Sequence, residues 1–487
     1  MITDIEALFA KGAPWPPKDD DTANRLKKYA NNESLFMGEH GEVWKDEIRK
    51  LRADKSGDLR LVLNFFKRLS LLWADLVCGE APEVSAESEA EAEAIDRIIE
   101  DTDFWTVLSD AIIDVSKFGD AVFKIRYDGY GIIENVPPEY WFPVVDSGNV
   151  KRVKAHVLAY TIDAREEPGL IDVDVMVSAD NQSFLPEATI KAWEKEKPIS
   201  IGRVQYLKVE IHTVGRIEHR LYRIADEKID AQLDLNQLPE FRGMVTIEET
   251  GLDDFCVQLI QNVTSTKRYH GMDDYLDIAD IIRELEWRYA QILRIEDKFS
   301  DPWMFGPPIE EQDPRDGEYK ITGGSKYINL VEGQSPPGMI TWNGELPANF
   351  VTIESLMQRL FEISETCKVA FDASAGGQGL SAQALRIMLT SPLKKTNRLQ
   401  TRATPTVKRL LRLCSALEVN AGMAGAVELS NLKITWHDGL PADEMADAQR
   451  DAVLVTGSVR SAQGLMRDRG MPEEKITKEY GEMMNRI

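Results

Sequence analysis

Two segments with helical apolar stripes flank a stretch dense in proline and glycine, and this arrangement most constrains the fold. The first stripe consists of Ile278, Ile282, Leu285, Tyr289, Ile292 and Phe299. The second consists of Phe350, Ile353, Met357, Leu360, Ile363 and Cys367. Residues 302–344, which lie between them, contain too many helix-breaking residues to continue either helix. The pattern predicts two long helices that pack as an antiparallel pair and are joined by a compact insert.

The first of these helices is expected to begin near residue 272 and to reach Ser300, a length of about 40 Å. Asp273 and Asp274 are expected to cap it, because carboxylates accept hydrogen bonds from the free amides of a helix start. Pro302 prevents the helix from continuing. The second helix is expected to begin at Pro347, a favourable first-turn residue.

The N-terminal half predicts a mixture of helices and strands. Amphipathic helices are expected over residues 64–79 and 104–117, and a solvated helix is expected over the Glu- and Ala-rich residues 87–100. Strands at 121–127 and 132–136 flank a hairpin turn signal. From residue 153 to 247 the apolar residues alternate with a period of two, which predicts a β-rich unit. The fold class is therefore α+β.

The last quarter of the chain is expected to be mainly helical. A small, Gly-rich loop occupies residues 372–380. A long helix is expected over residues 381–418, kinked or broken at Pro392 and Pro405 because proline cannot donate the helical hydrogen bond. A charged helical unit follows.

The net charge of −24 argues against a protein that binds nucleic acid tightly by neutralising phosphates. It does not argue against a conduit, because a wall that held DNA tightly would prevent its movement. Residues 373–417 contain no acidic residue at all, and this stretch carries eight cations, of which five are candidate contact residues: Arg386, Lys394, Lys395, Arg398 and Arg402. These cations are expected to contact DNA, to pair with an acidic surface of a neighbouring subunit, or both.

Enzyme signatures are missing from the sequence. No phosphate-binding loop, zinc-protease motif or nucleophile elbow is found, so no catalytic residue, metal or cofactor is predicted. His212 and His219 flank an expected hairpin, and two surface histidines are favoured over a metal site there. The carboxylate pairs Asp253-Asp254, Asp273-Asp274 and Glu310-Glu311 are expected to be solvated charge. A cytosolic acidic hydrolase that uses paired carboxylates remains the alternative.

The four cysteines are far apart in sequence and are expected to be reduced thiols. The N-terminus lacks the pattern of a signal peptide, and no apolar run is long enough to span a bilayer, so no membrane partner is expected.

Several local motifs, in this order, resemble the portal (head-to-tail connector) proteins of tailed bacteriophages. Residues 64–69 with Gly79-Glu80-Ala81-Pro82 look like an early helix of that family and its exit. Residues 118–125, followed by Pro137-Pro138-Glu139 and Val144-Val145-Asp146, are similar to a family strand and its loop. Residues 381–386 look like the motif that starts the family's kinked helix, with Ala382 in place of the usual glycine.

The resemblance implies a portal-type subunit with a β-containing wing, two long antiparallel stem helices, a small α/β clip insert, a long kinked helix and a helical C-terminal crown. It implies the following regions: wing, residues 1–255; first stem helix region, 256–300; clip, 301–345; second stem helix, 346–371; tunnel loop, 372–380; kinked helix and return to the wing, 381–435; and crown, 436–487.

The resemblance also implies a structural role and partners. Portal proteins form a homo-oligomeric ring, usually a dodecamer, at one capsid vertex, through which double-stranded DNA is packaged and ejected without sequence specificity. The implied partners are the terminase ATPase, the scaffold and major capsid protein, and a head-completion or tail adaptor protein. The implied location is the virion, and the host cytoplasm during assembly. A tail adaptor ring is a further possibility, which the length of the chain disfavours.

Two more sets of site residues follow from the resemblance. The DNA-facing tunnel loop comprises Asp372, Ala373, Ser374, Gly376, Gly377, Gln378 and Gly379. The docking surface of the clip comprises Pro307, Pro308, Glu310, Glu311 and Asp313.

Overall fold

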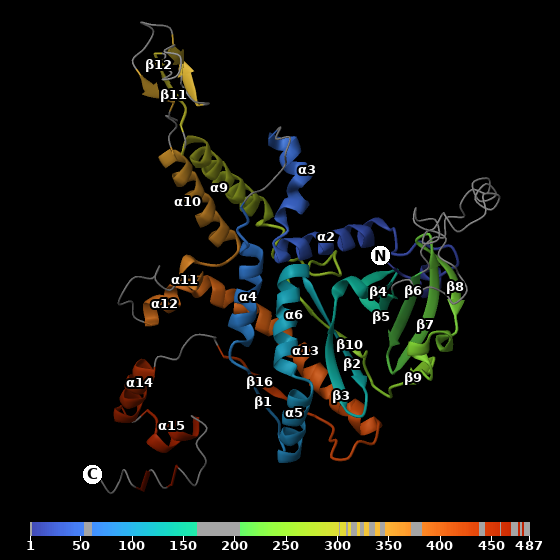
Figure 1. Ribbon diagram of the computed structural model, residues 1–487. Helices are drawn as coiled ribbons and strands as arrows, with labels where there is room; N and C mark the ends of the chain where they lie inside the picture. The colour runs from blue at the N-terminus through green and yellow to red at the C-terminus, as the bar shows by residue number, and fades with distance from the viewer. Residues whose placement is uncertain are drawn as a thin grey trace, which may run out of the picture.

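The computed structural model has the α+β class that the sequence predicts, with helices along the whole chain and five separate sheets in the described part. It describes residues 2–52, 61–162, 205–300, 302–307, 310–312, 319–321, 326–330, 337–340, 346–371, 382–437, 444–457 and 459–468, and residues 476, 477, 480 and 481. Figure 1 shows a body of helices and sheets from which one pair of helices extends. Among the described helices, none is both long and apolar enough to cross a membrane.

Six helices make up most of the N-terminal part. They are α1 (Ile5–Leu8), α2 (Asp20–Met37), α3 (His40–Arg52), α4 (Phe65–Cys78), α5 (Glu89–Asp101) and α6 (Phe104–Phe118). The predicted helices at 64–79 and 104–117 are thus confirmed as α4 and α6. The helix predicted at 87–100 is confirmed as α5, but it is not solvated all round, because one face buries Ala94, Ile95 and Ile98 in the main core.

A three-stranded antiparallel sheet follows α6. The predicted hairpin is confirmed as β2 (Asp120–Tyr127) and β3 (Gly131–Val136). The third strand, β10 (Val257–Gln261), pairs with the other edge of β2 although more than a hundred residues separate them. Side chains of this sheet pack with α4, α5, α6 and α13 in the largest core cluster.

The predicted β-rich unit is a six-stranded antiparallel sheet. Its strands run in the order β4 (Trp141–Asp146), β5 (Asn149–Ile162), β6 (Gln205–Thr213), β7 (Arg216–Ala225) and β8 (Lys228–Leu233), and β9 (Ile247–Glu249) also pairs with β7. Short 3-10 helices lie at Pro138–Tyr140, Leu235–Gln237 and Pro239–Phe241. The N-terminal segment covers one face of the sheet, where Phe9 and Trp15 pack against Phe142 and Tyr222.

The two helices predicted around the Pro/Gly-rich insert are α9 (Ala279–Phe299) and α10 (Leu346–Ile363), which lie side by side and lead to the insert at one end (Figure 1). Ile282 and Leu285 of α9 and Ile353 and Leu360 of α10 are buried in one cluster with Phe66 of α4. Each such side chain contributes about 1.5–3 kcal/mol to stability. Toward the insert, Leu293, Phe350 and Val351 remain exposed.

The described insert consists of short strands. These are β11 (Met304–Gly306), β12 (Glu310–Gln312), β13 (Tyr319–Ile321), β14 (Tyr327–Asn329) and β15 (Gly338–Met339). β14, β11 and β15 form one sheet, and β12 pairs with β13. The expected insert was α/β; no helix occurs among its described residues.

Helix α9 begins later than predicted, and its length is therefore about 32 Å rather than 40 Å. Asp273 and Asp274 do not cap it, because the residue before the helix is Ile278, which makes no side-chain cap. Asp273 instead accepts a hydrogen bond from the amide of Leu276 in the preceding turn.

The long helix predicted for residues 381–418 is divided into α12 (Ala382–Met388) and α13 (Thr390–Asn420). The break falls at Leu389 rather than at either proline. Pro392 lies in the first turn of α13, where its missing amide proton is not needed, and Pro405 lies inside the continuous helix. The remaining elements are α11 (Lys368–Phe371), α14 (Glu444–Thr456), α15 (Ala462–Asp468) and the strand pair β1 (Glu83–Ser85) and β16 (Lys433–Thr435).

Candidate functional site

Lys395, a predicted contact residue for DNA or a neighbouring subunit, is buried and paired inside its own chain. Its Nζ lies 2.9 Å from Oδ1 of Asp274 and 4.2 Å from the centroid of the Trp73 ring. Only 8% of the Lys395 side chain is exposed. Within the subunit, this cation holds α13 against the segment that leads into α9.

Two further cations of the same helix also have partners within the chain. Arg398 forms an ion pair of 2.6 Å with Glu365, which follows α10. Arg402 donates to the main-chain carbonyl of Asn262 at 2.8 Å, just after β10. Arg398 keeps 43% of its side chain exposed, so it remains accessible from solvent.

Arg386 and Lys394, the other two predicted contact residues, are exposed on α12 and on the first turns of α13. Exposure of the five predicted residues therefore decreases along the chain. Those on α12 and at the start of α13 are exposed, and those further along α13 are partly or fully buried. The structure does not bring them together into one patch, since Lys395 and Arg402 point into the subunit.

The predicted tunnel loop lies outside the described residues, and so do Pro308 and Asp313 of the predicted docking surface. Pro307 is exposed at the end of β11. Glu310 and Glu311 lie in β12, opposite Ile321 and Lys320 of β13. The insert also exposes apolar side chains that sequence reasoning did not select: Trp303, Met304, Ile328, Met339 and Ile340.

A close glycine contact joins α6 to the segment before α9. Gly119, at the end of α6, has φ +88°, and a Cβ placed there would lie 2.6 Å from the carbonyl oxygen of Gly271. A Cβ on Gly271 would in turn lie 1.9 Å from the carbonyl oxygen of Gly119. Both positions therefore require glycine, for the backbone approach and, at Gly119, for the left-handed conformation.

Asp120, the next residue, is fully buried and accepts hydrogen bonds from four groups. The donors are the Tyr29 hydroxyl, the Gln261 amide, the backbone amide of Gly271 and the ring of His270. Burial acts to raise the pKa of Asp120, but these hydrogen bonds and His270 hold that pKa below its ordinary value. Asp120 is therefore an ionised carboxylate that joins separate segments of the chain by hydrogen bonds. Its sequence motif alone did not reveal this role.

The expectation that His212 and His219 are surface histidines is wrong. Both are buried, because Lys124 of β2 and the segment around Phe255 cover this face of the six-stranded sheet. His212 Nε2 lies 3.4 Å from Glu210, which also lies 2.9 Å from Lys124, 2.7 Å from Lys208 and 4.0 Å from His219. In the described part of the chain, no group of three or more His, Cys, Asp or Glu side chains is arranged to hold a metal ion.

Next to this cluster, Trp141 Nε1 donates to His156 Nδ1 at 3.0 Å. Burial, and to a smaller extent the nearby His212, lowers the pKa of His156 from 6.5 to about 3, which favours the neutral form. The imidazole is thus a neutral acceptor inside the sheet.

A second buried pair links the N-terminal helices to α9. His40 Nδ1 lies 2.6 Å from Glu286 Oε1, and His40 Nε2 lies 2.8 Å from the carbonyl oxygen of Leu35. The amide of Leu63 also donates to Glu286. Both residues lie on helices with apolar stripes, and no local sequence signal distinguishes them from surface charges.

The carboxylate pairs proposed for an acidic hydrolase do not converge. Asp273 pairs with Lys28, and Asp274 pairs with Lys395, so each is directed to a different helix. Asp253 lies 3.5 Å from Arg412 and is mostly exposed. These carboxylates are partners of cations and do not face one another.

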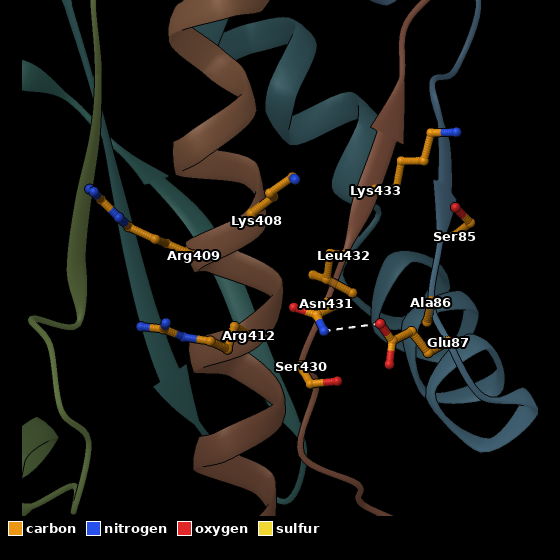
Figure 2. Close-up of a pocket in the computed structure, with 10 residues that line it drawn as sticks. All are labelled: Ser85, Ala86, Glu87, Lys408, Arg409, Arg412, Ser430, Asn431, Leu432 and Lys433. Atoms are coloured by element: carbon orange, nitrogen blue, oxygen red, sulfur yellow. Dashed lines mark hydrogen bonds between the residues drawn. The ribbon is translucent and has the colours of Figure 1, made fainter.

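A groove of about 610 Å³ lies between α13 and the paired strands β1 and β16 (Figure 2). Four cations line it: Lys408, Arg409, Arg412 and Lys433. We call this feature the basic groove. Among the described residues that line the groove, Glu87 is the only acidic one, and it accepts a hydrogen bond of 3.0 Å from Asn431. The acid-free segment of the sequence contains three of these cations, but the strand that completes the groove lies outside it.

The described chain thus combines an α+β body, a projecting helix pair and a groove on α13 lined by cations. Residues 17–237, slightly under half of the chain, match the family described as "Phage portal protein, SPP1 Gp6-like". The resemblance to the portal proteins of tailed bacteriophages is thereby confirmed.

No protein of curated function matches the chain. Among solved structures, a chain of the "Virion of native gene transfer agent (GTA) particle" is similar, with 11% sequence identity and a TM-score of 0.39. The alignment covers 95% of this chain and 96% of that chain.

Proposed function

We propose that this protein is a phage portal subunit that assembles into a ring and has the partners and regions of the portal family. The observation that carries the proposal is the family match over residues 17–237. In this role the ring forms a channel at one capsid vertex through which double-stranded DNA is packaged and ejected. The ring also initiates capsid assembly and serves as the docking site for the terminase ATPase and for head-completion or tail proteins.

The helix pair supports this proposal. Ile353 and Leu360 of α10 are directed to α9, whereas Phe350, Val351 and Ile363 of the same helix are 49%, 67% and 47% exposed. Exposed apolar side chains do not stabilise an isolated subunit. A neighbouring copy that packed against α10 would remove them from water. In a closed ring, each subunit presents one flank to the next by the same heterologous contact.

The regions of the chain have the following roles in this proposal. Helices α9 and α10 form the stem, and the strand-rich insert between them forms the clip, on which other proteins dock. The loop at 372–380 faces DNA, the C-terminal helices form the crown, and residues 1–255 form most of the wing. The exposed Trp303, Met304 and Met339 of the insert supply apolar area for such docking.

Electron microscopy of the purified full-length protein tests the proposal. Class averages are expected to show rings with a central hole and a rotational symmetry near twelve. Mass photometry of the same sample gives the number of copies independently. A particle that stays monomeric at concentrations well above micromolar contradicts the proposed function.

A further inference from the structure

The basic groove contains cations that the subunit itself does not neutralise. Within the described part of the chain, Lys408, Arg409 and Lys433 have no ion-pair partner, and Arg412 has only the exposed Asp253 at 3.5 Å. By contrast, Lys395, Arg398 and Arg402 of the same helix are all engaged. In a chain with a net charge of −24, an unneutralised group of cations is unusual and indicates a contact beyond the subunit.

Helix α5 carries the opposite feature. Four acidic side chains are exposed along it, at spacings of four, three and four residues: Glu89, Glu93, Asp96 and Glu100. This spacing places them on one face, over about 16 Å of the helix. The other face is buried in the core, and none of the four has an ion-pair partner among the described residues. We call these four residues the acidic stripe.

Arg409 and Arg412 of the groove do not reach the acidic stripe within one subunit. Figure 2 shows Arg409 and Arg412 extending from the side of α13 that faces away from α5, whose ribbon lies beyond β1. The contact that joins α5 to α13 uses other residues, namely the ion pair of Arg97 with Glu418 at 2.7 Å. The two arginines and the acidic stripe therefore point to different sides of α13, as a heterologous contact between identical copies requires.

We propose that the basic groove binds the acidic stripe of a second copy of this chain. The inference rests on the proposed ring, and it assigns the charged part of the contact between neighbouring copies. Copies that each carry a charge of −24 repel one another, and this contact places the unneutralised cations of one copy against carboxylates of the next. The acidic stripe supplies an occupant of matching charge on the same chain, whereas no feature of the groove selects phosphate over carboxylate.

Charge reversal in two separate variants tests the contact. Arg409→Glu/Arg412→Glu reverses two of the four cations of the groove, and Glu93→Lys/Glu100→Lys reverses two of the four carboxylates of the stripe. Each variant alone is expected to lose ring assembly by at least about tenfold, because like charges then face each other. An equimolar mixture is expected to recover rings, since each kind of copy then meets an opposite charge on both flanks. Mass photometry at 150 mM NaCl measures the fraction of protein in rings.

A matched control separates this contact from the change in net charge. Lys11→Glu/Lys27→Glu alters two exposed lysines in the N-terminal part and changes the net charge as much as the groove variant does. Its rings are expected to persist. If the groove variant fails to fold by circular dichroism, Arg409→Gln/Arg412→Gln replaces it, with a smaller expected loss and stronger sensitivity to salt.

Three outcomes overturn the inference. If both reversal variants form rings as the wild type does, the groove does not contact the stripe. The proposed ring is then unaffected, and only this contact is wrong. If the groove variant still forms rings but no longer binds a 30-base-pair DNA duplex in a mobility-shift assay, the groove binds nucleic acid instead. A wild-type protein that forms no ring at all removes both the proposed function and this contact.

Discussion

Lys395 Nζ and Asp274 Oδ1 lie 2.9 Å apart and join α13 to the segment that leads into α9. Only 8% of the Lys395 side chain and 15% of the Asp274 side chain are exposed. Asn262, which follows β10, also donates to Asp274 at 2.9 Å. One carboxylate therefore connects the long basic helix, the three-stranded sheet and the approach to the helix pair.

Replacing Lys395 with methionine is expected to lower the free energy of unfolding by about 3 kcal/mol. The methionine keeps the length of the side chain, but it leaves the partly buried Asp274 without its cation. Urea unfolding followed by tryptophan fluorescence measures the loss. Lys394→Met, at the exposed neighbouring position, is the control and is expected to change stability by less than about 0.5 kcal/mol. If both variants lower the free energy of unfolding equally, the ion pair of Lys395 with Asp274 does not stabilise the fold.

Gly119→Ala is expected to destabilise the protein more strongly than Gly12→Ala, although both glycines have a positive φ. At Gly119 the new Cβ would lie 2.6 Å from the Gly271 carbonyl, whereas at Gly12 nothing lies within 4 Å. Gly12→Ala therefore isolates the backbone strain, about 1 kcal/mol, and Gly119→Ala adds the steric clash, for a total of at least about 3 kcal/mol. Thermal unfolding of both variants compares them, and similar melting temperatures refute the close contact.

The stability of the protein is expected to depend on pH through His156. The folded state lowers the pKa of His156 from 6.5 to about 3, so the neutral imidazole is the form that folding favours. Its contribution is complete above pH 6.5 and is lost as the pH falls from 6.5 toward 3. His156→Gln keeps an acceptor for Trp141 but cannot titrate, so its melting temperature is expected to fall less between pH 7 and pH 4 than that of the wild type.

The matching control for this pH dependence is His437→Gln, whose histidine side chain is 38% exposed. This variant is expected to follow the wild-type curve. If His156→Gln is as sensitive to acid as the wild type, the loss of stability comes from other groups, such as the carboxylates.

Val351→Asp is expected to prevent ring assembly without unfolding the subunit. Val351 is 67% exposed on α10, so the charge is tolerated in an isolated copy but not in an apolar contact with a neighbour. Size-exclusion chromatography gives the assembly state, and circular dichroism verifies the fold. Asn24→Asp, an exposed change of the same charge on α2, is the control. Rings formed by Val351→Asp show that this face of α10 is not part of the contact.

The sequence predicted those elements whose signals are local. Helices α4 and α6 and the β2–β3 hairpin follow from periodicity and from a turn signal at Asp128-Gly129, and the structure confirms them. The start of α9 was predicted too early, because Asp273 and Asp274 resemble caps in sequence but are held by Lys28 and Lys395 in the structure. Local patterns do not distinguish a capping carboxylate from one that is directed to a distant lysine.

The same limit explains the errors at the histidines and at α5. An exposed and a buried strand face can carry the same alternating pattern, and what covers His212 is a hairpin from another part of the chain. Likewise, the buried face of α5 depends on α13, which follows it by nearly three hundred residues. The basic groove needs β16 as well as α13, so the acid-free segment alone did not reveal it.

By itself, the sequence determined the α+β class, the two striped helices around a Pro/Gly-rich insert and the acid-free segment 373–417, because these depend on residues that are neighbours along the chain. Only the tertiary structure decided that Lys395 is an internal partner, that Gly119 and Gly271 must meet and that four cations share one groove. Those relationships join residues far apart in sequence, and they exist only because burying the apolar faces of distant elements brings their backbones together.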